Sequence, residues 1–321
     1  MKAWTLCSCL APQIETFISL RQLSGTDYQS QARLLGYFDR FLVAQDFQQL
    51  GITRDICDRY QNSLSRLAPR SQGNRFCVVR QLCKYLARTD PHNYIPEALH
   101  TPSSRQAHRP YIFTCDQVGM LMTVAATLPP SGSLRPHTYR TLLGLLFSTG
   151  IRIGEAFALN IEHFFPEEQR LYIAEGKFRK SRWLVLSAST SLALERYLDR
   201  RKIMAANGPE TPLLLNERRQ RLCHPTVRQA FMHMLHESGI PWIRHVGPRI
   251  HDLRHSFAVN RLLAWYRDGE DVNARLPALA TYMGHVDISS TQVYLQPTAE
   301  LLGEVDRRFH EHYLKHLASK G

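Results

Sequence analysis

The chain has 321 residues, of which 44% are hydrophobic and 21% are charged, a composition typical of a globular protein and not of a disordered one. Lysine and arginine outnumber aspartate and glutamate by 40 to 28, and a net charge of +12 attracts polyanions such as nucleic acid or an anionic membrane surface. The sequence contains no apolar run of 18 residues and no signal-peptide pattern, which argues against the membrane. We therefore expect a cytoplasmic protein that does not bind membranes, with its seven cysteines reduced.

The first hundred residues predict helices separated by short turns, because apolar residues recur there at helical spacing. The predicted helical segments start near Ile14, Arg33, Ile56 and Ser71. The last segment also carries a basic stripe, in which Arg75 and Lys84 are candidate nucleic-acid contacts, although a solvated helix face explains the charge equally well. We interpret residues 1–95 as a helical domain.

Residues 96–112 predict a linker, because prolines and polar residues gather there without periodicity. A larger domain over residues 113–298 follows and opens with a helix capped by Thr114 or Asp116. Two alternating segments, 170–174 and 182–186, predict a β-hairpin with a basic tip. The rest of this domain has helical periodicity, including residues 192–204 and 226–237. The expected fold class is mainly α with a small β-sheet (α+β).

A first motif lies between residues 148 and 155 and reads S-T-G-I-R-I-G-E. Gly150 is expected to end the preceding apolar helix and to place Arg152 at the start of the next one. A guanidinium is poorly placed at a helix N-terminus unless an anion is to be bound there. Arg152 is therefore a candidate anion-binding residue.

A second motif, H-D-L-R-H-S over residues 251–256, is followed by His285 and then by Tyr294. His251 and Arg254 are three residues apart and are expected on one face of a helix. Arginine binds phosphate oxygens in a bidentate manner, histidine exchanges protons near neutral pH, and tyrosine supplies a nucleophilic oxygen. Together with Arg152, these residues are what phosphodiester cleavage by a protein nucleophile needs.

In their order and spacing, the motifs resemble those of the tyrosine recombinase (phage lambda integrase) family, in particular its Xer-like and transposon-associated members. The resemblance extends over residues 15–315. The matching elements are T-G-x-R-x-x-E (Thr149 to Glu155), G-K-x-x-K-x-R (Gly176 to Arg182), H-x-L-R-H (His251 to His255), M-G-H in place of L-G-H (Met283 to His285), and a tyrosine nine residues later (Tyr294). The segment 265–277 is longer than in short family members, which places simple Xer-like chromosome-dimer resolution in doubt.

The resemblance implies a role for each matching residue. Tyr294 attacks the scissile phosphate and forms a 3′-phosphotyrosyl link, and no cofactor or metal is required. Arg152 and Arg254 hold the non-bridging oxygens. The candidate general acid is Lys177, with Lys180 competing for the same role.

The remaining roles fall to His251 as proton acceptor for the tyrosine and His285 as a hydrogen-bond donor to the phosphate. Glu155 is expected to orient the active-site groups, although a helix-surface glutamate explains its position nearly as well. The histidines are not interpreted as metal ligands, because nothing specifies a third ligand.

The resemblance also implies an architecture and partners. A SAM-like helical core-binding domain and a mixed catalytic domain would close as a C-shaped clamp around double-stranded DNA, with Arg105 and Arg109 of the linker near phosphates. Family members assemble on DNA as homo- or hetero-tetramers, in some cases with other recombinases. The apolar face of the helical tail, residues 299–321, suits docking onto a neighbouring protomer or packing within its own chain.

The expected function is site-specific DNA recombination, for integration or transposition of a mobile element. A type IB topoisomerase would use nearly the same residues, but its lysine and motif spacing fit less well. A catalytically decayed DNA-binding protein would be expected to have lost some of the six catalytic positions.

Overall fold

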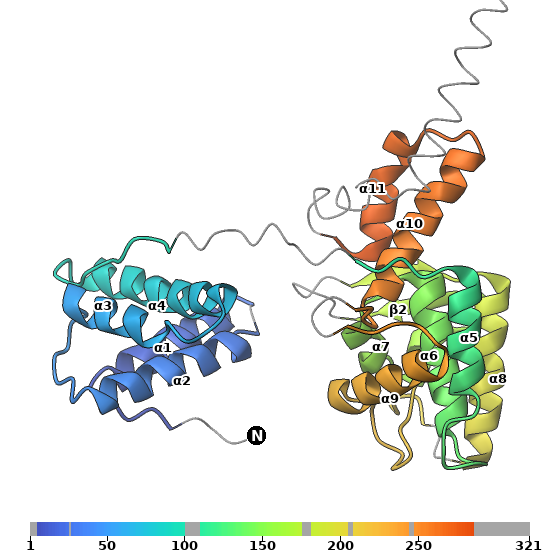
Figure 1. Ribbon diagram of the computed structural model, residues 1–321, viewed down its shortest axis with the longest axis horizontal. Coiled ribbons are helices and arrows are strands. Elements are labelled where there is room, and N and C mark those ends of the chain that lie inside the picture. The colour runs from blue at the N-terminus through green and yellow to red at the C-terminus, as the bar shows by residue number, and fades with distance from the viewer. Residues whose placement is uncertain are drawn as a thin grey trace, which may run out of the picture. The chain divides into compact units, whose positions relative to one another are not determined.

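The computed structural model describes residues 5–25, 27–99, 110–174, 181–204, 208–243 and 247–285. The chain forms two compact units, residues 1–107 and 108–321, each with its own hydrophobic core (Figure 1). Helices dominate the described residues of both units, and the strands form one small antiparallel sheet in the second. The expected fold class is thereby confirmed.

The first unit packs helices around an apolar core. Its described helices are α1 (Ala11–Leu23), α2 (Gln29–Ala44), α3 (Arg54–Ser63) and α4 (Pro69–Thr89). Phe38 of α2 and Tyr60 of α3 meet edge-to-face in this core, with ring centroids 4.8 Å apart. These helices confirm the periodicity in the sequence, although Leu20 and Val43 lie exposed on the outer faces of α1 and α2.

The second unit is built around α6, which lies beside α5 and α8 and also packs against α10 (Figure 1). Its helices are α5 (Cys115–Ala125), α6 (Arg135–Thr149), α7 (Ile153–Ala158), the 3-10 turn η1 (Ile161–His163), α8 (Ala188–Met204), α9 (His224–Glu237), α10 (Asp252–Arg267) and α11 (Val272–Met283). Because α6 is surrounded, apolar residues such as Leu142 and Leu146 are buried on several of its faces. This arrangement places the C-terminal end of α6 inside the unit.

The sheet has the order β1 (Phe164–Phe165), β2 (Arg170–Ile173), β3 (Arg182–Val185). Strands β2 and β3 pair antiparallel with Leu171 opposite Leu184, which confirms the predicted hairpin. Leu171 and Leu184 face the core, whereas Trp183 and Val185 alternate outward. The two-residue strand β1 was not predicted, since it is too short to show a period.

A helix cap at Thr114 and a long-range contact at Ser256 position the beginning of the second unit. Thr114 caps α5 and forms a capping box with Gln117, so Thr114 and not Asp116 is the cap. Ser256 of α10 accepts a hydrogen bond from the Phe113 backbone N–H at 2.8 Å and donates one to the Asp252 carbonyl at 2.8 Å. The start of the second unit is therefore tied to the helix that carries the H-D-L-R-H motif.

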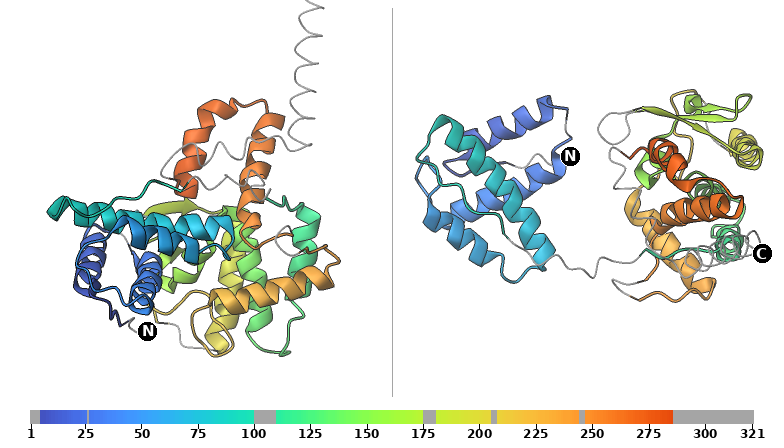
Figure 2. Two further views of the ribbon diagram at one scale, coloured as in Figure 1. Left: turned by 60° about the vertical axis from the view of Figure 1, so that its left-hand side comes forward. Right: turned by 90° about the horizontal axis from the view of Figure 1, so that it is seen from above.

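The segment 265–277 forms the end of α10, a turn, and the first half of α11. Asp271 caps α11 by accepting hydrogen bonds from the backbone N–H groups of Asn273 and Ala274. Helices α10 and α11 lie side by side (Figures 1 and 2). Across the residues that the structure describes, no helix has the length and apolar character needed to span a bilayer.

Candidate active site

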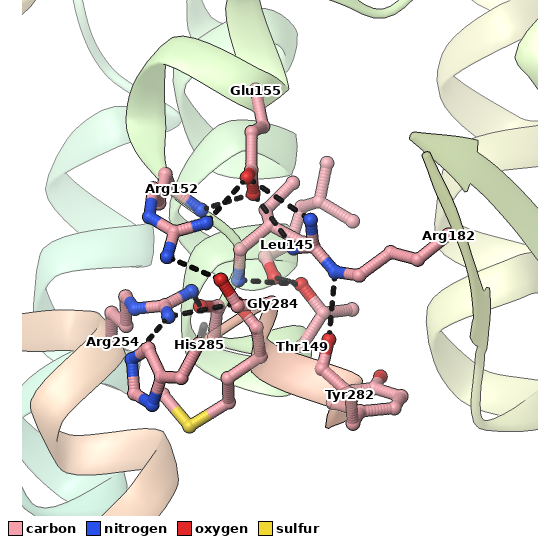
Figure 3. Close-up of polar contacts among 12 residues, drawn as sticks. Leu145, Thr149, Arg152, Glu155, Arg182, Arg254, Tyr282, Gly284 and His285 are labelled. Carbon is pink, nitrogen blue, oxygen red and sulfur yellow. Dashed lines mark hydrogen bonds and ion pairs between the residues drawn. The ribbon is translucent and has the colours of Figure 1, made fainter. Parts of the chain in front are cut away.

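The arginines and histidines of the sequence motifs meet where three segments of the second unit converge: the α6–α7 junction, the start of α10 and the end of α11 (Figure 3). Each helix end is shaped by a turn. Gly150 follows α6 and Gly284 follows α11, both in the left-handed conformation with φ of 62° and 70°. Their carbonyl groups point at the arginines, as described below.

The α6–α7 junction presents Arg152 as the N-cap of α7, as the sequence predicted. The anion at this helix terminus is Glu155 of the same helix, which accepts a hydrogen bond from the Arg152 backbone N–H at 3.0 Å. The Arg152 side chain also reaches Glu155, with Nη1 2.7 Å from Oε1. Glu155 is therefore buried within the arginine cluster, and the alternative of a helix-surface glutamate is wrong.

Arg182 of β3 completes this cluster from the other side. Its Nη1 and Nη2 lie 3.0 and 2.8 Å from the two Glu155 carboxylate oxygens, and its Nε donates to the Tyr282 carbonyl at 2.9 Å. Burial on its own would raise the pKa of Glu155, but the hydrogen bonds and charges of Arg182 and Arg152 outweigh it and hold that pKa at about 2. Glu155 is thus a permanent anion shared by two arginines.

The second arginine of the motifs, Arg254, is 2% exposed and lies deeper than Arg152. Its Nη1 donates to the Gly150 carbonyl at 2.5 Å, and its Nη2 donates to the Met283 carbonyl at 2.8 Å. Arg152 Nη2 donates in turn to the Gly284 carbonyl at 2.7 Å. Each arginine is therefore held by the backbone of a glycine turn that belongs to another segment.

The histidines lie around Arg254 in their neutral form. His285 Nε2 is 2.8 Å from Arg254 Nη2, and since an arginine only donates, this nitrogen accepts. Burial, followed by the charges of Arg254, Arg152 and Arg182, lowers the pKa of His285 to about 4. The same two influences, loss of hydration and then the Arg254 charge, lower the pKa of His251.

His251 and His255 form an edge-to-face pair with ring centroids 5.1 Å apart. Burial and the neighbouring His251 lower the pKa of His255 to about 4. His251 is the N-cap of α10, has helical φ and ψ of −66° and −22°, and its residue surface is exposed. The Arg254 backbone N–H donates to the His251 carbonyl at 3.1 Å, so the two residues lie in one helical turn. An exposed, unprotonated imidazole at this place can accept a proton from a group that approaches from solvent.

Two residues of this cluster were not singled out from the sequence. Arg182 is the last residue of the G-K-x-x-K-x-R pattern, and that position was the available signal. Asp252 is fully buried at the start of α10, where it accepts from the Arg249 backbone N–H at 2.8 Å. The available signal for Asp252 was its place in the first turn of α10, directly after the N-cap.

Several predicted residues lie outside the described residues, so their positions are not part of this geometry. They are Lys177, Lys180, Tyr294, Arg105, Arg109 and the tail 299–321. Within the described ranges, no group of three histidine, cysteine, aspartate or glutamate residues is placed to hold a metal ion.

The two candidate DNA contacts of the first unit differ in their surroundings. The Arg75 guanidinium lies over the Tyr37 ring, 4.2 Å from its centroid, so it has a packing role in α4 and α2. Lys84 is exposed on α4. Of the pair, Lys84 is thus the more exposed side chain.

Comparison with known proteins decides the family. Residues 112–300, more than half of the chain, match the model of the phage integrase family. The chain belongs to this family. The resemblance to tyrosine recombinases seen in the motifs is thereby confirmed, and the cluster described above lies within the matched region.

Relatives of this integrase-family chain match it over almost its whole length. The Sinorhizobium fredii protein y4rB, whose name assigns it provisionally to the integrases/recombinases, is 33% identical over 92% of this chain and 95% of its own. Tyrosine recombinase XerC of Pelobacter propionicus is 27% identical over 94% of this chain and 97% of its own.

Solved structures share the fold of this integrase-family chain. The Tn1549 transposon integrase, solved with transposon right-end DNA, has a TM-score of 0.64 at 13% identity, covering 92% of this chain and 98% of that one. The XerH recombinase bound to difH substrate has a TM-score of 0.62 at 18% identity, covering 98% and 84%.

Proposed function

We propose that this protein is a site-specific tyrosine recombinase that cleaves double-stranded DNA and rejoins it through a covalent bond to Tyr294. The observation that carries the proposal is the convergence of Arg152, Arg254 and His285 from three distant segments on one site. Family membership and the Xer and integrase relatives support strand cleavage and rejoining as the reaction. Among the described residues, no contact favours a topoisomerase or a decayed enzyme.

In the proposed reaction the Tyr294 oxygen attacks the scissile phosphorus, and the bond between phosphorus and the 5′-oxygen breaks. The tyrosine proton passes to His251, and the departing 5′-oxygen takes a proton from Lys177, with Lys180 as the alternative donor. The phosphodiester becomes a 3′-phosphotyrosyl ester, so its energy is retained and neither ATP nor a metal ion is consumed. Attack by the 5′-hydroxyl of a partner strand reverses the step and exchanges strands.

Arg152 supports phosphate binding in this scheme. The hydrogen bonds to Glu155 and Gly284 occupy one N–H on each of its Nη atoms, and a guanidinium carries five donors in all. Its side chain is 23% exposed, so the other donors are accessible to a non-bridging oxygen. Glu155 fixes the plane of the guanidinium, which reduces the reorganisation needed when charge develops on the phosphorane.

Arg254 and His285 form a second, deeper contact for the phosphate. The Nε2 atom of His285 already accepts from Arg254, so the other ring nitrogen carries the proton of the neutral imidazole. That N–H is the proposed donor to the phosphate, and Arg254 supplies the positive charge behind it. A neutral His285 can fulfil this role throughout the physiological pH range.

The proposal extends to partners and location. The Tn1549 transposon integrase was solved in complex with transposon right-end DNA, and lambda integrase was solved as a dimer bound to a core site. We propose double-stranded DNA as the partner and assembly as a homo- or hetero-tetramer. We propose a cytoplasmic location, because an enzyme that acts on DNA needs access to it.

The proposal is tested with a nicked suicide DNA that carries the ends of the mobile element encoding the protein. Wild-type protein is expected to give a covalent protein–DNA band on a denaturing gel, and Tyr294→Phe none. Tyr266→Phe, a helix tyrosine outside the motifs, is the matched control and is expected to keep the band. A band that persists with Tyr294→Phe would show that another residue is the nucleophile, and no band despite tight DNA binding would refute cleavage.

A further inference from the structure

A pocket of about 440 Å³ lies in the second unit between α5, α6 and α8, which run side by side in Figure 1. It is lined by the flank of α6 that includes His137, Arg140 and Gly144, and by the flank of α8 that includes Arg196 and Arg200. The arginines of the candidate active site, which are Arg152 at the N-cap of α7, Arg182 on β3 and Arg254 on α10, do not line it. Its volume lies in the range of small-molecule sites.

The charges around this pocket all have one sign. Arg140, Arg196 and Arg200 are exposed at its rim, and no aspartate or glutamate is among the residues that line it. The closest carboxylates along α8 have other partners: Asp199 pairs with Lys202 at 3.1 Å, and Glu195 accepts from the Ser191 hydroxyl at 3.1 Å. Within the described ranges, the three arginines make no ion pair.

This arrangement has a free-energy cost in the absence of an anion. Arg196 and Arg200 are four residues apart on one helix face, where like charges repel, and Arg140 of α6 lines the same pocket. The same positive charges act on His137, because burial and then the charges of Arg200 and Arg140 lower the pKa of its imidazole. A bound anion would remove the repulsion among these groups.

The remaining lining has the composition of a site for an organic phosphate. Hydroxyl groups of Thr141, Ser148, Ser189 and Thr190 also line the pocket, and hydroxyls and arginines are the usual side-chain ligands of phosphate. Apolar side chains, among them Met122 and Leu194, provide a surface for an uncharged ring.

We propose that this pocket binds the phosphate groups of a nucleotide, with Arg140, Arg196 and Arg200 as the anion ligands. Its volume of about 440 Å³ accommodates one nucleotide unit. The unit belongs to a free nucleotide or to an unpaired end of a DNA strand, and the two share the same phosphate chemistry. The inference does not rest on the recombinase reaction, because none of these residues has a role in it.

Isothermal titration of the full-length protein tests the proposal with four probes: ATP, adenosine, and a ten-nucleotide single strand with or without a 5′-phosphate. The pocket variant is R196Q/R200Q. The control is R218Q/R267Q, which removes two other exposed arginines of the same unit and has the same net charge. Wild type and control are expected to bind ATP or the phosphorylated strand, and the pocket variant is expected to bind that probe at least tenfold more weakly. None of the three proteins is expected to bind adenosine.

Saturable ATP binding that depends on the pocket identifies a free nucleotide as the ligand, and dependence seen only with the phosphorylated strand identifies a DNA end. Equal weakening in both double variants, or equal binding of ATP and adenosine, would overturn the proposal. The covalent Tyr294 adduct is measured in parallel on the suicide DNA and is expected to persist in R196Q/R200Q. Loss of the adduct in wild type with intact nucleotide binding would therefore count against the recombinase proposal alone.

Discussion

Arg182 and Glu155 form a two-pronged ion pair in which Nη1 and Nη2 of the arginine lie 3.0 and 2.8 Å from the two carboxylate oxygens. The same carboxylate binds Arg152, and the Nε of Arg182 binds the carbonyl of Tyr282 near the end of α11 (Figure 3). One side chain thus connects β3, α7 and α11. The strand that follows the hairpin tip is in this way coupled to the arginine proposed to bind the phosphate.

Arg182→Gln is expected to destabilise the protein and to slow DNA cleavage. The Arg182 and Glu155 side chains are only 11% and 7% exposed, and the substitution leaves the buried carboxylate with Arg152 as its remaining ion-pair partner. The expected loss in the free energy of unfolding is therefore more than about 1 kcal/mol but less than the cost of about 3–5 kcal/mol for a buried charge without any partner. Urea unfolding measures the loss. The rate of DNA cleavage is expected to fall as well, because the Glu155 carboxylate that holds Arg152 then lacks its two hydrogen bonds from Arg182.

Arg170→Gln on the neighbouring strand is the matched control for this measurement. Arg170 pairs with Glu168, but both side chains are more than 40% exposed, so the expected loss is below about 1 kcal/mol. Similar losses in the two variants would show that the Arg182–Glu155 pair is no more than a surface contact.

Acid is expected to destabilise the protein through Glu155. Its pKa is about 2 in the folded protein against an ordinary value of 4.5. A carboxylate whose pKa is depressed by folding stabilises the folded state at pH values above its pKa in the unfolded chain. This stabilisation is lost as the pH falls from about 4.5 to about 2. The shift corresponds to at most about 3 kcal/mol. In urea titrations over this range, Glu155→Gln should show a flatter decline than wild type, whereas Glu168→Gln, at an exposed position, should follow wild type.

The sequence predicted the parts of the site that depend on local spacing. The Gly150 turn, the hairpin and the position of Arg152 all follow from patterns within a few residues, and the structure has each of them. Contacts between distant segments could not be derived this way. Nothing local to Arg182 indicates that it meets Glu155, 27 residues away, and nothing local to Arg254 indicates that it binds the carbonyl of Gly150.

Glu155 and the anion at the N-terminus of α7 were separate expectations, whereas in the structure Glu155 is itself that anion. Arg152 at the start of α7 does accompany an anion, but that anion is Glu155 in the first turn of the same helix. Charge alone could not distinguish an internal anion from an external phosphate. The distinction needed the side-chain directions at the start of α7.

Gly150→Ala and Gly284→Ala are expected to disrupt the site. Both residues have positive φ, and a Cβ at Gly150 would lie 2.3 Å from the Phe257 ring, while one at Gly284 would lie 2.7 Å from Arg182 Nη1. The left-handed conformation and the clash together should cost at least about 2 kcal/mol in either variant. Thermal unfolding and the covalent-adduct assay measure the two consequences.

Gly154→Ala separates this effect from a general intolerance of alanine near the site. A Cβ at Gly154 meets no atom within 4 Å, and the residue lies in the first turn of α7 without a positive φ. The expected result is a stability within about 1 kcal/mol of wild type, on the stabilising side. A loss in this variant equal to that of Gly150→Ala would contradict the steric account.

The half-buried His285 is expected to set a second, higher pH range in which stability declines. With a pKa of about 4 in the folded protein against an ordinary 6.5, His285 takes up its proton in the unfolded chain first. Stability should therefore fall as the pH drops from about 6.5 to about 4, before Glu155 begins to titrate. His285→Gln keeps a hydrogen-bond acceptor for Arg254 but cannot titrate, so its free energy of unfolding should change less between pH 7 and pH 5 than that of wild type. The exposed His233→Gln should retain the wild-type slope, and a His285→Gln slope as steep as wild type would show that His285 already carries a proton beside Arg254 in the folded protein.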